Sequence, residues 1–186
     1  MVQLVKRELY GGAITMDLPA DMIDASMFRQ IPDTQEVYVS KENPDYSIII
    51  DLLECVPATT LYNALDEHMQ EITRLNGATL KTTKMLSQRD TTTNSNINSS
   101  SNSETIVPAF AGVRVFEQQV AKFGKQQDVE SVVIAIGLVR LPSPANSDIL
   151  ITVNNHVTSS STATLETLTA TLVHSLSVVD PALFVA

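Results

Sequence analysis

Two segments of this chain are apolar on both faces of an extended backbone, and they restrict the possible folds more than any other feature. Residues 47–54 read Ser-Ile-Ile-Ile-Asp-Leu-Leu-Glu, and residues 132–141 are almost entirely apolar. Successive side chains of a strand point to opposite faces, so a strand that is apolar on both needs cover on both. The two segments therefore predict central strands of a sheet that is covered on each side.

Two other segments repeat apolar residues with the period of an amphipathic helix and can supply this cover. The first runs from Thr59 to Leu75, with a threonine to cap its start and Asn76-Gly77 to end it. The second runs from Thr162 to Ser177, and its many threonines mean that packing must hold it. The apolar stripes are Leu61, Leu65, His68, Ile72 and Leu75 in the first, and Leu165, Leu168, Leu172 and Leu176 in the second.

Further strand signals complete the predicted sheet. Residues 106–153 read as three consecutive strands, and their short connections favour antiparallel neighbours. Residues 78–88 carry a weaker strand signal. An extended piece from Glu8 to Leu18 is interrupted by Gly11-Gly12, which favours a tight turn or a bulge. No lysine and helix start follow this glycine pair, so a phosphate-binding loop is disfavoured.

The segment from Glu36 to Ser40 alternates in the manner of a strand with one buried face. Val37 and Val39 share one face, and Glu36 and Tyr38 share the other. If the valines face the core, Glu36 and Tyr38 point to solvent together. An acid beside an exposed aromatic side chain is typical of a protein interface.

These elements predict an α+β fold, in which a mainly antiparallel sheet is flanked by helices on both faces. The 186 residues favour one domain over 1–186 and are ample for a sizeable core. Residues 89–105 are rich in serine, threonine and asparagine and contain Ile97 as the only large apolar residue. Such a segment buries too little surface to offset its ordering entropy, so we expect a flexible loop there.

Composition excludes several classes of function. The net charge of −9 argues against nucleic acid and anionic membranes, and it suits a basic protein partner. No uncharged apolar run approaches the roughly 20 residues that a membrane helix needs. Cys55 is the only cysteine, and residues 1–20 lack a signal-peptide core, so we expect a soluble intracellular protein. We also expect a monomer.

Candidate catalytic groups are few. The three histidines are His68, His156 and His174, and none has a companion at metal-ligand spacing. Cys55 has no nearby basic residue in the sequence to lower its pKa. We therefore expect no enzyme, no metal site and no cofactor. A small hydrolase or ligand-binding domain would require the three histidines to converge from distant segments.

The distribution of acids is more informative. Residues 17–54 contain 9 acids and 2 bases, so they carry −7 of the net −9. Each acid has an ordinary structural explanation. Asp24 can cap a helical turn through Phe28, Asp33 can form a Pro-Asp turn, and Asp51 can lie at a sheet edge or be neutralised by a partner. The local excess as a whole still favours a basic protein partner.

The order and spacing of several motifs resemble the Mog family of Ran-binding nuclear-import factors over nearly the whole chain. The combination of Gly-Gly-Ala with Pro-Asp-Thr-Gln-Glu-Val is specific to this resemblance. The matching motifs are Leu-Tyr-Gly-Gly-Ala at 9–13, Ile-Asp-Ala-Ser at 23–26, Ile-Pro-Asp-Thr-Gln-Glu-Val-Tyr at 31–38, residues 47–54, Leu-Val-Arg-Leu at 138–141 and Val-Asp-Pro-Ala-Leu-Phe at 179–184.

The resemblance implies an antiparallel sheet flanked by helices, similar to the extrinsic oxygen-evolving protein of plant photosystems. It also implies a protein of nucleus and cytoplasm that binds the GTPase Ran, promotes release of its guanine nucleotide and supports nuclear import. The implied Ran-binding residues are Asp24, Asp33 and Glu36, with Arg29, Thr34 and Gln35 as supporting neighbours. The alternative is an adaptor that uses the same face for another basic protein and leaves nucleotide unaffected.

Overall fold

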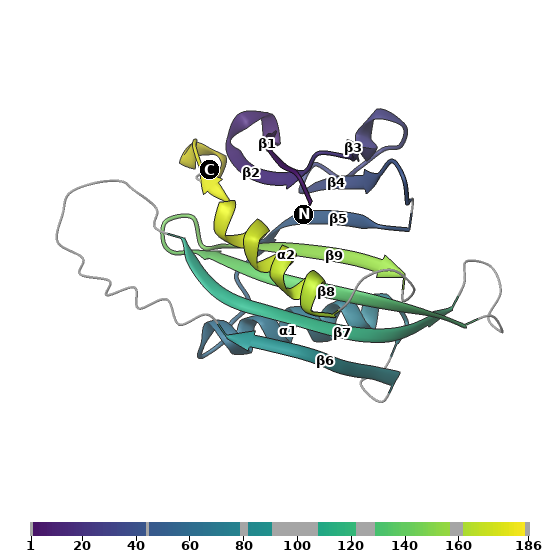
Figure 1. Cartoon of the computed structure of the whole chain (residues 1–186). Coiled ribbons are helices and arrows are strands. Elements are labelled where there is room, and N and C mark those ends of the chain that lie inside the picture. Colours follow the sequence, from purple (N-terminus) through teal and green to yellow (C-terminus); the bar gives the residue numbers. More distant parts are fainter. Residues whose placement is uncertain are drawn as a thin grey trace.

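The computed structural model describes residues 2–43, 45–78, 82–90, 108–121, 129–156 and 162–184. Its elements alternate between strands, two α-helices and short 3-10 turns labelled η (Figure 1). They are β1 (Leu4–Leu9), η1 (Tyr10–Gly12), β2 (Ile14–Pro19), β3 (Met22–Asp24), η2 (Ala25–Met27), β4 (Gln35–Ser40), β5 (Ser47–Glu54), α1 (Leu61–Leu75), β6 (Thr83–Asp90), β7 (Ala109–Ala121), β8 (Val129–Leu141), β9 (Ser147–His156), α2 (Thr162–Ser175), β10 (Ser177–Val178) and η4 (Pro181–Phe184).

The main sheet is antiparallel and has the strand order β3-β4-β5-β9-β8-β7-β6. Helix α2 crosses one face and α1 lies behind the other (Figure 1). A second sheet, of order β1-β2-β10, shares the α2 side. The predicted α+β class with helices on both faces is confirmed. The two segments predicted as central strands are β5 and β8, which both lie inside the sheet.

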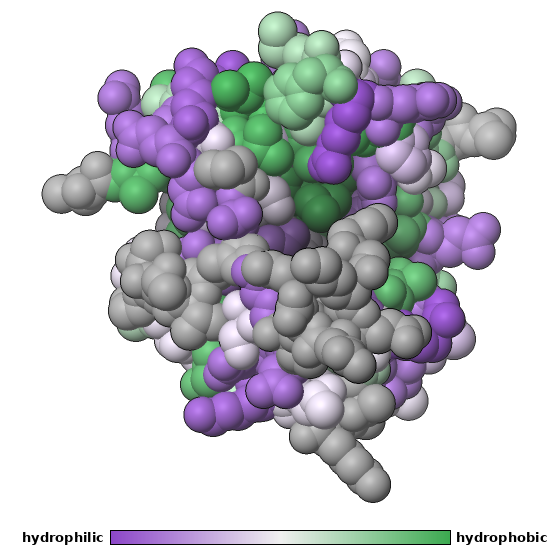
Figure 2. Space-filling view, turned by 90° about the vertical axis from the view of Figure 1, so that its right-hand side faces the viewer, coloured by the Kyte–Doolittle hydropathy of each residue, from purple (hydrophilic) through white to green (hydrophobic). Residues whose placement is uncertain are grey.

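The core is divided between the two faces of the main sheet. On the α2 side, buried residues of β5, β8 and β9 pack with the β1–β2 hairpin and with Leu165 and Leu172 of α2. On the α1 side, Leu65 packs against apolar residues of β7, β8 and β9. On the face of the molecule in Figure 2, apolar residues gather in the upper half and hydrophilic residues flank them.

Helix α1 begins and ends where its capping residues predict. The Thr60 hydroxyl accepts a hydrogen bond from the Asn63 amide at 3.1 Å, and Gly77 takes a φ of 67° after the last turn. The apolar stripe, however, continues beyond the part of α1 that the sheet covers. Leu75, predicted to belong to the buried stripe, is 69% exposed.

The predicted exposure of Tyr38 is wrong, since its side chain is only 5% exposed. The β1–β2 hairpin packs over the face of β4 that carries Tyr38, and places it in one cluster with Leu9 and Met16. Val37, on the opposite face of β4, is also buried. Strand β4 is therefore covered on both faces, which alternation along one strand does not reveal.

The predicted loop 89–105 begins two residues too early. Arg89 and Asp90 are the last residues of β6 and pair with Val113 and Gly112 of β7. The Asp90 carboxylate accepts a hydrogen bond at 2.8 Å from the buried Arg114, which holds this strand end. Residues 91–105 lie outside the described residues. None of the described helices is long and apolar enough to cross a membrane.

A candidate partner-binding surface

Two segments that are distant in the sequence meet beside the acidic stretch. The Tyr10 amide donates a hydrogen bond to the Glu36 carboxylate at 2.6 Å. The Tyr10 hydroxyl lies 2.8 Å from the carbonyl oxygen of Ile50 and 3.1 Å from that of Thr34. Positive φ angles at Tyr10 and at the two glycines after it fold this tight turn. The glycine pair therefore shapes the backbone, as predicted, and Tyr10 ties the hairpin to β4 and β5.

Glu36 is half-buried and engaged within the protein. Burial raises the pKa of its carboxyl, the hydrogen bond from the Tyr10 amide opposes this, and the nearby Asp24 raises the pKa further. The structure thus brings Glu36 and Asp24 close enough to repel each other. Both lie on the face of β3 and β4 that carries Tyr38, because Asp24 pairs with Tyr38 in the register.

Asp24 also has an internal role. Its carboxylate accepts a hydrogen bond from the Ser26 amide at 2.8 Å and caps η2. The predicted N-cap is confirmed, although the turn is 3-10 rather than α-helical. Because this hydrogen bond fixes the Asp24 side chain, its negative charge also has a fixed position on the surface.

Asp33 differs from the other two acids. It is exposed in the turn before β4, where the Gln35 amide donates to the Pro32 carbonyl at 2.9 Å. Among the described residues its carboxylate has no hydrogen bond or ion pair. Arg29 is likewise exposed, and its backbone amide donates to the Ala25 carbonyl at 3.0 Å. Asp33 is therefore the acid whose charge is directed fully to solvent.

Thr34 and Gln35 support the Asp33 turn. The Thr34 carbonyl accepts a hydrogen bond from the Leu52 amide at 2.8 Å, which ties the turn to β5. The Gln35 side-chain amide donates to the Asp51 carboxylate at 2.5 Å. Burial raises the pKa of Asp51, and this hydrogen bond opposes the rise. Asp51 is thus satisfied by a polar neighbour inside the sheet.

Met27 and Phe28 are the surface residues that sequence reasoning overlooked. They are 78% and 62% exposed, although both are large and apolar. The signal was present, because they are adjacent apolar residues in a short turn that has no room for an amphipathic helix before Pro32. The sequence predicts a helical turn through Met27 and Phe28, but a helical turn by itself does not indicate whether their side chains are buried or exposed.

A buried polar cluster lies on the α1 side of the sheet, around Asp148. Arg140 donates to this carboxylate at 2.7 and 2.8 Å, and the His68 Nε2 lies 2.8 Å from it. The Val56 amide donates at 3.2 Å. His68 is buried, as the sequence predicted, and its partners link α1 to β8 and β9. The Cys55 thiol also lies 3.5 Å from an Asp148 oxygen, so the cluster fastens α1, β8, β9 and the segment after β5 together.

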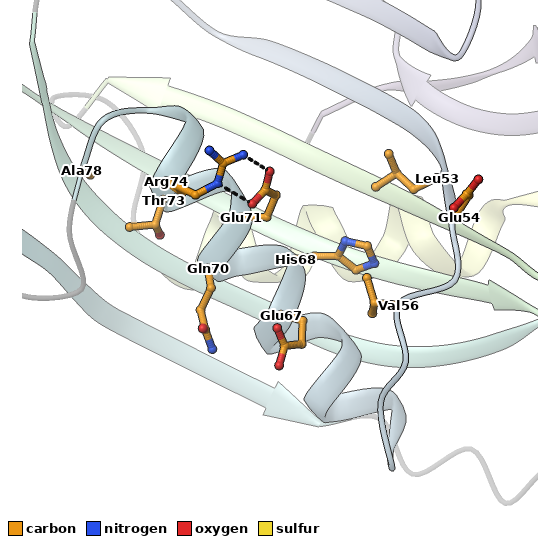
Figure 3. Close-up of a pocket in the computed structure, with 10 residues that line it drawn as sticks. All are labelled: Leu53, Glu54, Val56, Glu67, His68, Gln70, Glu71, Thr73, Arg74 and Ala78. Atoms are coloured by element: carbon orange, nitrogen blue, oxygen red, sulfur yellow. Dashed lines mark hydrogen bonds and ion pairs between the residues drawn. The ribbon is translucent and has the colours of Figure 1, made fainter.

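An open groove of about 690 Å³ lies beside His68, with Leu53 and Val56 on one side and the outer face of α1 on the other (Figure 3). Its opposite wall carries Glu71, which pairs with Arg74. His68 and His174 belong to helices on opposite faces of the sheet, so these two do not converge; the side chain of His156 lies outside the described residues. Burial raises the pKa of the nearby Cys55, the opposite of what a reactive thiol needs. No group of three or more metal-ligating side chains occurs among the described residues.

Comparison with known proteins places the chain in a family. The family model described as Ran-interacting Mog1 protein matches residues 7–156. The chain is 34% identical over 157 residues to the nuclear import protein MOG1 of Saccharomyces cerevisiae, covering 79% of this chain but only 64% of that protein's length. It is also 34% identical over 168 residues to a probable ran guanine nucleotide release factor of Dictyostelium discoideum, covering 88% of this chain and 82% of that protein.

Solved structures agree on the fold. The crystal structure of the Saccharomyces cerevisiae Ran-binding protein Mog1p aligns with a TM-score of 0.73 at 29% identity, covering 99% of this chain and 100% of that one. The solution structure of cyanobacterial PsbP from Synechocystis aligns over 96% of this chain and 94% of that one, with a TM-score of 0.53. At 11% identity, this second likeness shows the fold alone, and it confirms the expected similarity to a photosystem extrinsic protein. Since the family model matches well over half of its residues, the chain belongs to the Mog1 family of Ran-interacting proteins.

Proposed function

We propose that this protein binds the GTPase Ran and promotes release of its guanine nucleotide, in support of nuclear protein import in nucleus and cytoplasm. Family membership supports the partner, and the similarity to the yeast import protein and the Dictyostelium nucleotide release factor supports import and nucleotide release. The observation that carries the choice of surface is the exposed Asp33 carboxylate, which has no partner among the described residues and stands on a turn fixed from both sides.

The six residues of the proposed surface divide into three pairs by their internal contacts. Asp33 and Arg29 are free to contact the partner directly. Asp24 and Glu36 add negative potential but also hold η2 and the Tyr10 turn. The remaining two, Thr34 and Gln35, act by fixing the position of Asp33.

Nucleotide release follows from differential binding. A GTPase holds its nucleotide through a phosphate cradle and a magnesium ion, and its switch loops respond to both. A protein that binds the nucleotide-free form more tightly than the loaded form shifts the equilibrium toward release. Such a factor needs a complementary surface and no catalytic group of its own. Opposite charges on the two surfaces would accelerate their association.

The test measures release of a fluorescent guanine nucleotide from Ran. Asp33→Lys should slow the release that this protein promotes, because it reverses an exposed charge without breaking an internal bond. Glu67→Lys is the matched control, since Glu67 is an exposed acid on α1 outside the acidic stretch. Wild-type rates with both Asp33→Lys and Glu36→Lys would refute this surface. Glu36→Lys needs a folding check, because it also removes the acceptor of the Tyr10 amide.

An adaptor function on the same face is the second candidate, because the acidic excess alone suits any basic protein. An adaptor would bind Ran without accelerating nucleotide release, or would not bind Ran at all. The same release assay, combined with a direct binding measurement, separates the two functions.

A further inference from the structure

We propose that Met27 and Phe28 form the apolar centre of the surface that docks onto Ran, and that the surrounding acids form its rim. This inference rests on the proposed function and adds residues that neither the family match nor the charge pattern assigns. The partner chemistry is an apolar patch on Ran bordered by basic side chains.

Exposure of this pair is unusual within the molecule. Isolated exposed apolar residues are normal on any protein. The other large apolar residues that are exposed in the described part of the chain are separated from one another in sequence, and only Met27 and Phe28 are adjacent. Methionine and aromatic side chains are enriched at the centres of protein interfaces, where charged residues are depleted. The pair therefore has the composition of an interface core.

The backbone around the pair is fixed in this exposed arrangement. Ala25 is fully buried and occupies the inward position of the turn. Its carbonyl oxygen accepts hydrogen bonds from the amides of Phe28 at 3.2 Å and Arg29 at 3.0 Å. The Asp24 carboxylate caps the same turn. The backbone that carries Met27 and Phe28 is therefore already ordered before binding. A preorganised surface loses less conformational entropy when it binds, which favours higher affinity.

The setting of the pair supplies the second half of an interface. Met27 and Phe28 lie in the same connection between β3 and β4 as Arg29 and Asp33, within the region that carries most of the net negative charge. Binding energy concentrates in a few central apolar or aromatic residues, whereas rim charges chiefly steer association. The two kinds of residue should therefore affect binding in different ways.

This difference gives a sharp test by surface-immobilised Ran and measured association and dissociation rates. Phe28→Ala should weaken binding by roughly tenfold or more, mainly through faster dissociation, with an unchanged dependence on salt. Met27→Ala should act in the same direction. Asp33→Lys should instead slow association, and its effect should shrink as salt rises.

Leu75→Ala is the matched control, because Leu75 is 69% exposed and lies at the end of α1. It should leave both rates at the wild-type value. Phe28→Leu, which keeps an apolar side chain, should retain most of the affinity. Circular dichroism melting should show Phe28→Ala as stable as the wild type, since an exposed side chain is removed.

Three outcomes would overturn the inference. Wild-type dissociation rates for both Met27→Ala and Phe28→Ala would show that the pair lies outside the contact. A wild-type dimer that Phe28→Ala converts to monomer, with Ran binding unchanged, would assign the pair to a second copy of the chain. Absence of Ran binding by the wild type would refute the proposed function itself, which the first two outcomes leave intact.

Discussion

Asn in place of Asp148 should destabilise the fold strongly, although it changes only one side-chain atom. Asp148 is fully buried and accepts hydrogen bonds from Arg140, His68 and Val56. The asparagine side chain would place an NH2 donor where the carboxylate now accepts hydrogen bonds, so donor would face donor. It would also remove the negative charge that balances Arg140. Asp148 also connects α1 with β8, β9 and the end of β5. The substitution should therefore weaken the packing of these elements on the α1 side of the sheet.

The expected magnitude follows from the burial of the pair. Breaking a buried ion pair on one side destabilises a protein by about 3–5 kcal/mol. The Arg140 side chain is 18% exposed, so water can partly solvate it, and we expect the lower end of about 3 kcal/mol. For a chain of this size that corresponds to a fall in Tm of about 6–12 °C. Urea unfolding followed by circular dichroism measures the free energy directly.

The same cluster gives a pH signature. Burial alone would raise the pKa of Asp148, but the hydrogen bonds from Arg140, His68 and Val56 outweigh it and hold this pKa well below its usual range. Because the pKa of Asp148 is lower in the folded than in the unfolded protein, its ionised carboxylate stabilises the fold at pH values above the unfolded-state pKa of about 3.9. This stabilisation is lost as the pH falls below that value toward the folded-state pKa. The stability difference between wild type and Asp148→Asn should therefore narrow below about pH 4.

The control for this experiment is Glu71→Gln, which breaks the ion pair to Arg74 on the outer face of α1. Both partners are exposed, so the substitution should leave the unfolding midpoint unchanged. If Asp148→Asn unfolds at the same urea concentration as Glu71→Gln, the Asp148 cluster does not stabilise the fold as proposed. A stability difference that stays constant from neutral to acid pH would contradict the assigned pKa direction.

Three further predictions concern the surface and the sheet. Glu36→Gln should keep or raise Tm at neutral pH while weakening Ran binding, because burial disfavours the carboxylate and the amide oxygen can still accept from Tyr10; a clear fall in Tm would contradict this. Asp24→Asn should retain the η2 cap and dissociate from Ran at close to the wild-type rate, whereas Asp24→Ala should lose the cap and dissociate faster, which binding kinetics will report. Gly112→Ala should lower the free energy of unfolding by about 1–3 kcal/mol, since its φ is +123° and a Cβ would lie 2.3 Å from the Arg89 carbonyl; an unchanged urea midpoint would refute this.

Much of the fold could be predicted from periodicity and capping. The two doubly apolar strands lie inside the sheet, and α1 starts at Thr60 as its capping residue indicates. Periodicity fails where cover comes from a distant segment. Tyr38 is buried by a hairpin that precedes it by about twenty residues, and alternation in β4 carries no record of that packing.

The candidate surface was only partly predictable for a related reason. Counting charges located the acidic stretch, and the family resemblance singled out Asp24, Asp33 and Glu36 within it. Their contacts distinguish them, because two of the three accept hydrogen bonds from the backbone and Asp33 does not. Met27 was overlooked because exposure of an apolar residue depends on how the turn around it is held.

The pairing of β2 with β10 has a consequence for the order in which the molecule is assembled. β2 is hydrogen-bonded on one side to β1 and on the other to Ser177 and Val178. The hairpin that carries Tyr10 therefore gains its last neighbour from the far end of the described chain. During synthesis on the ribosome, the β1–β2 hairpin emerges early, but its pairing with β10 can form only after α2 has followed. A chain that stopped short of β10 would leave this edge of β2, close to the Tyr10 turn, without its hydrogen-bonded neighbour.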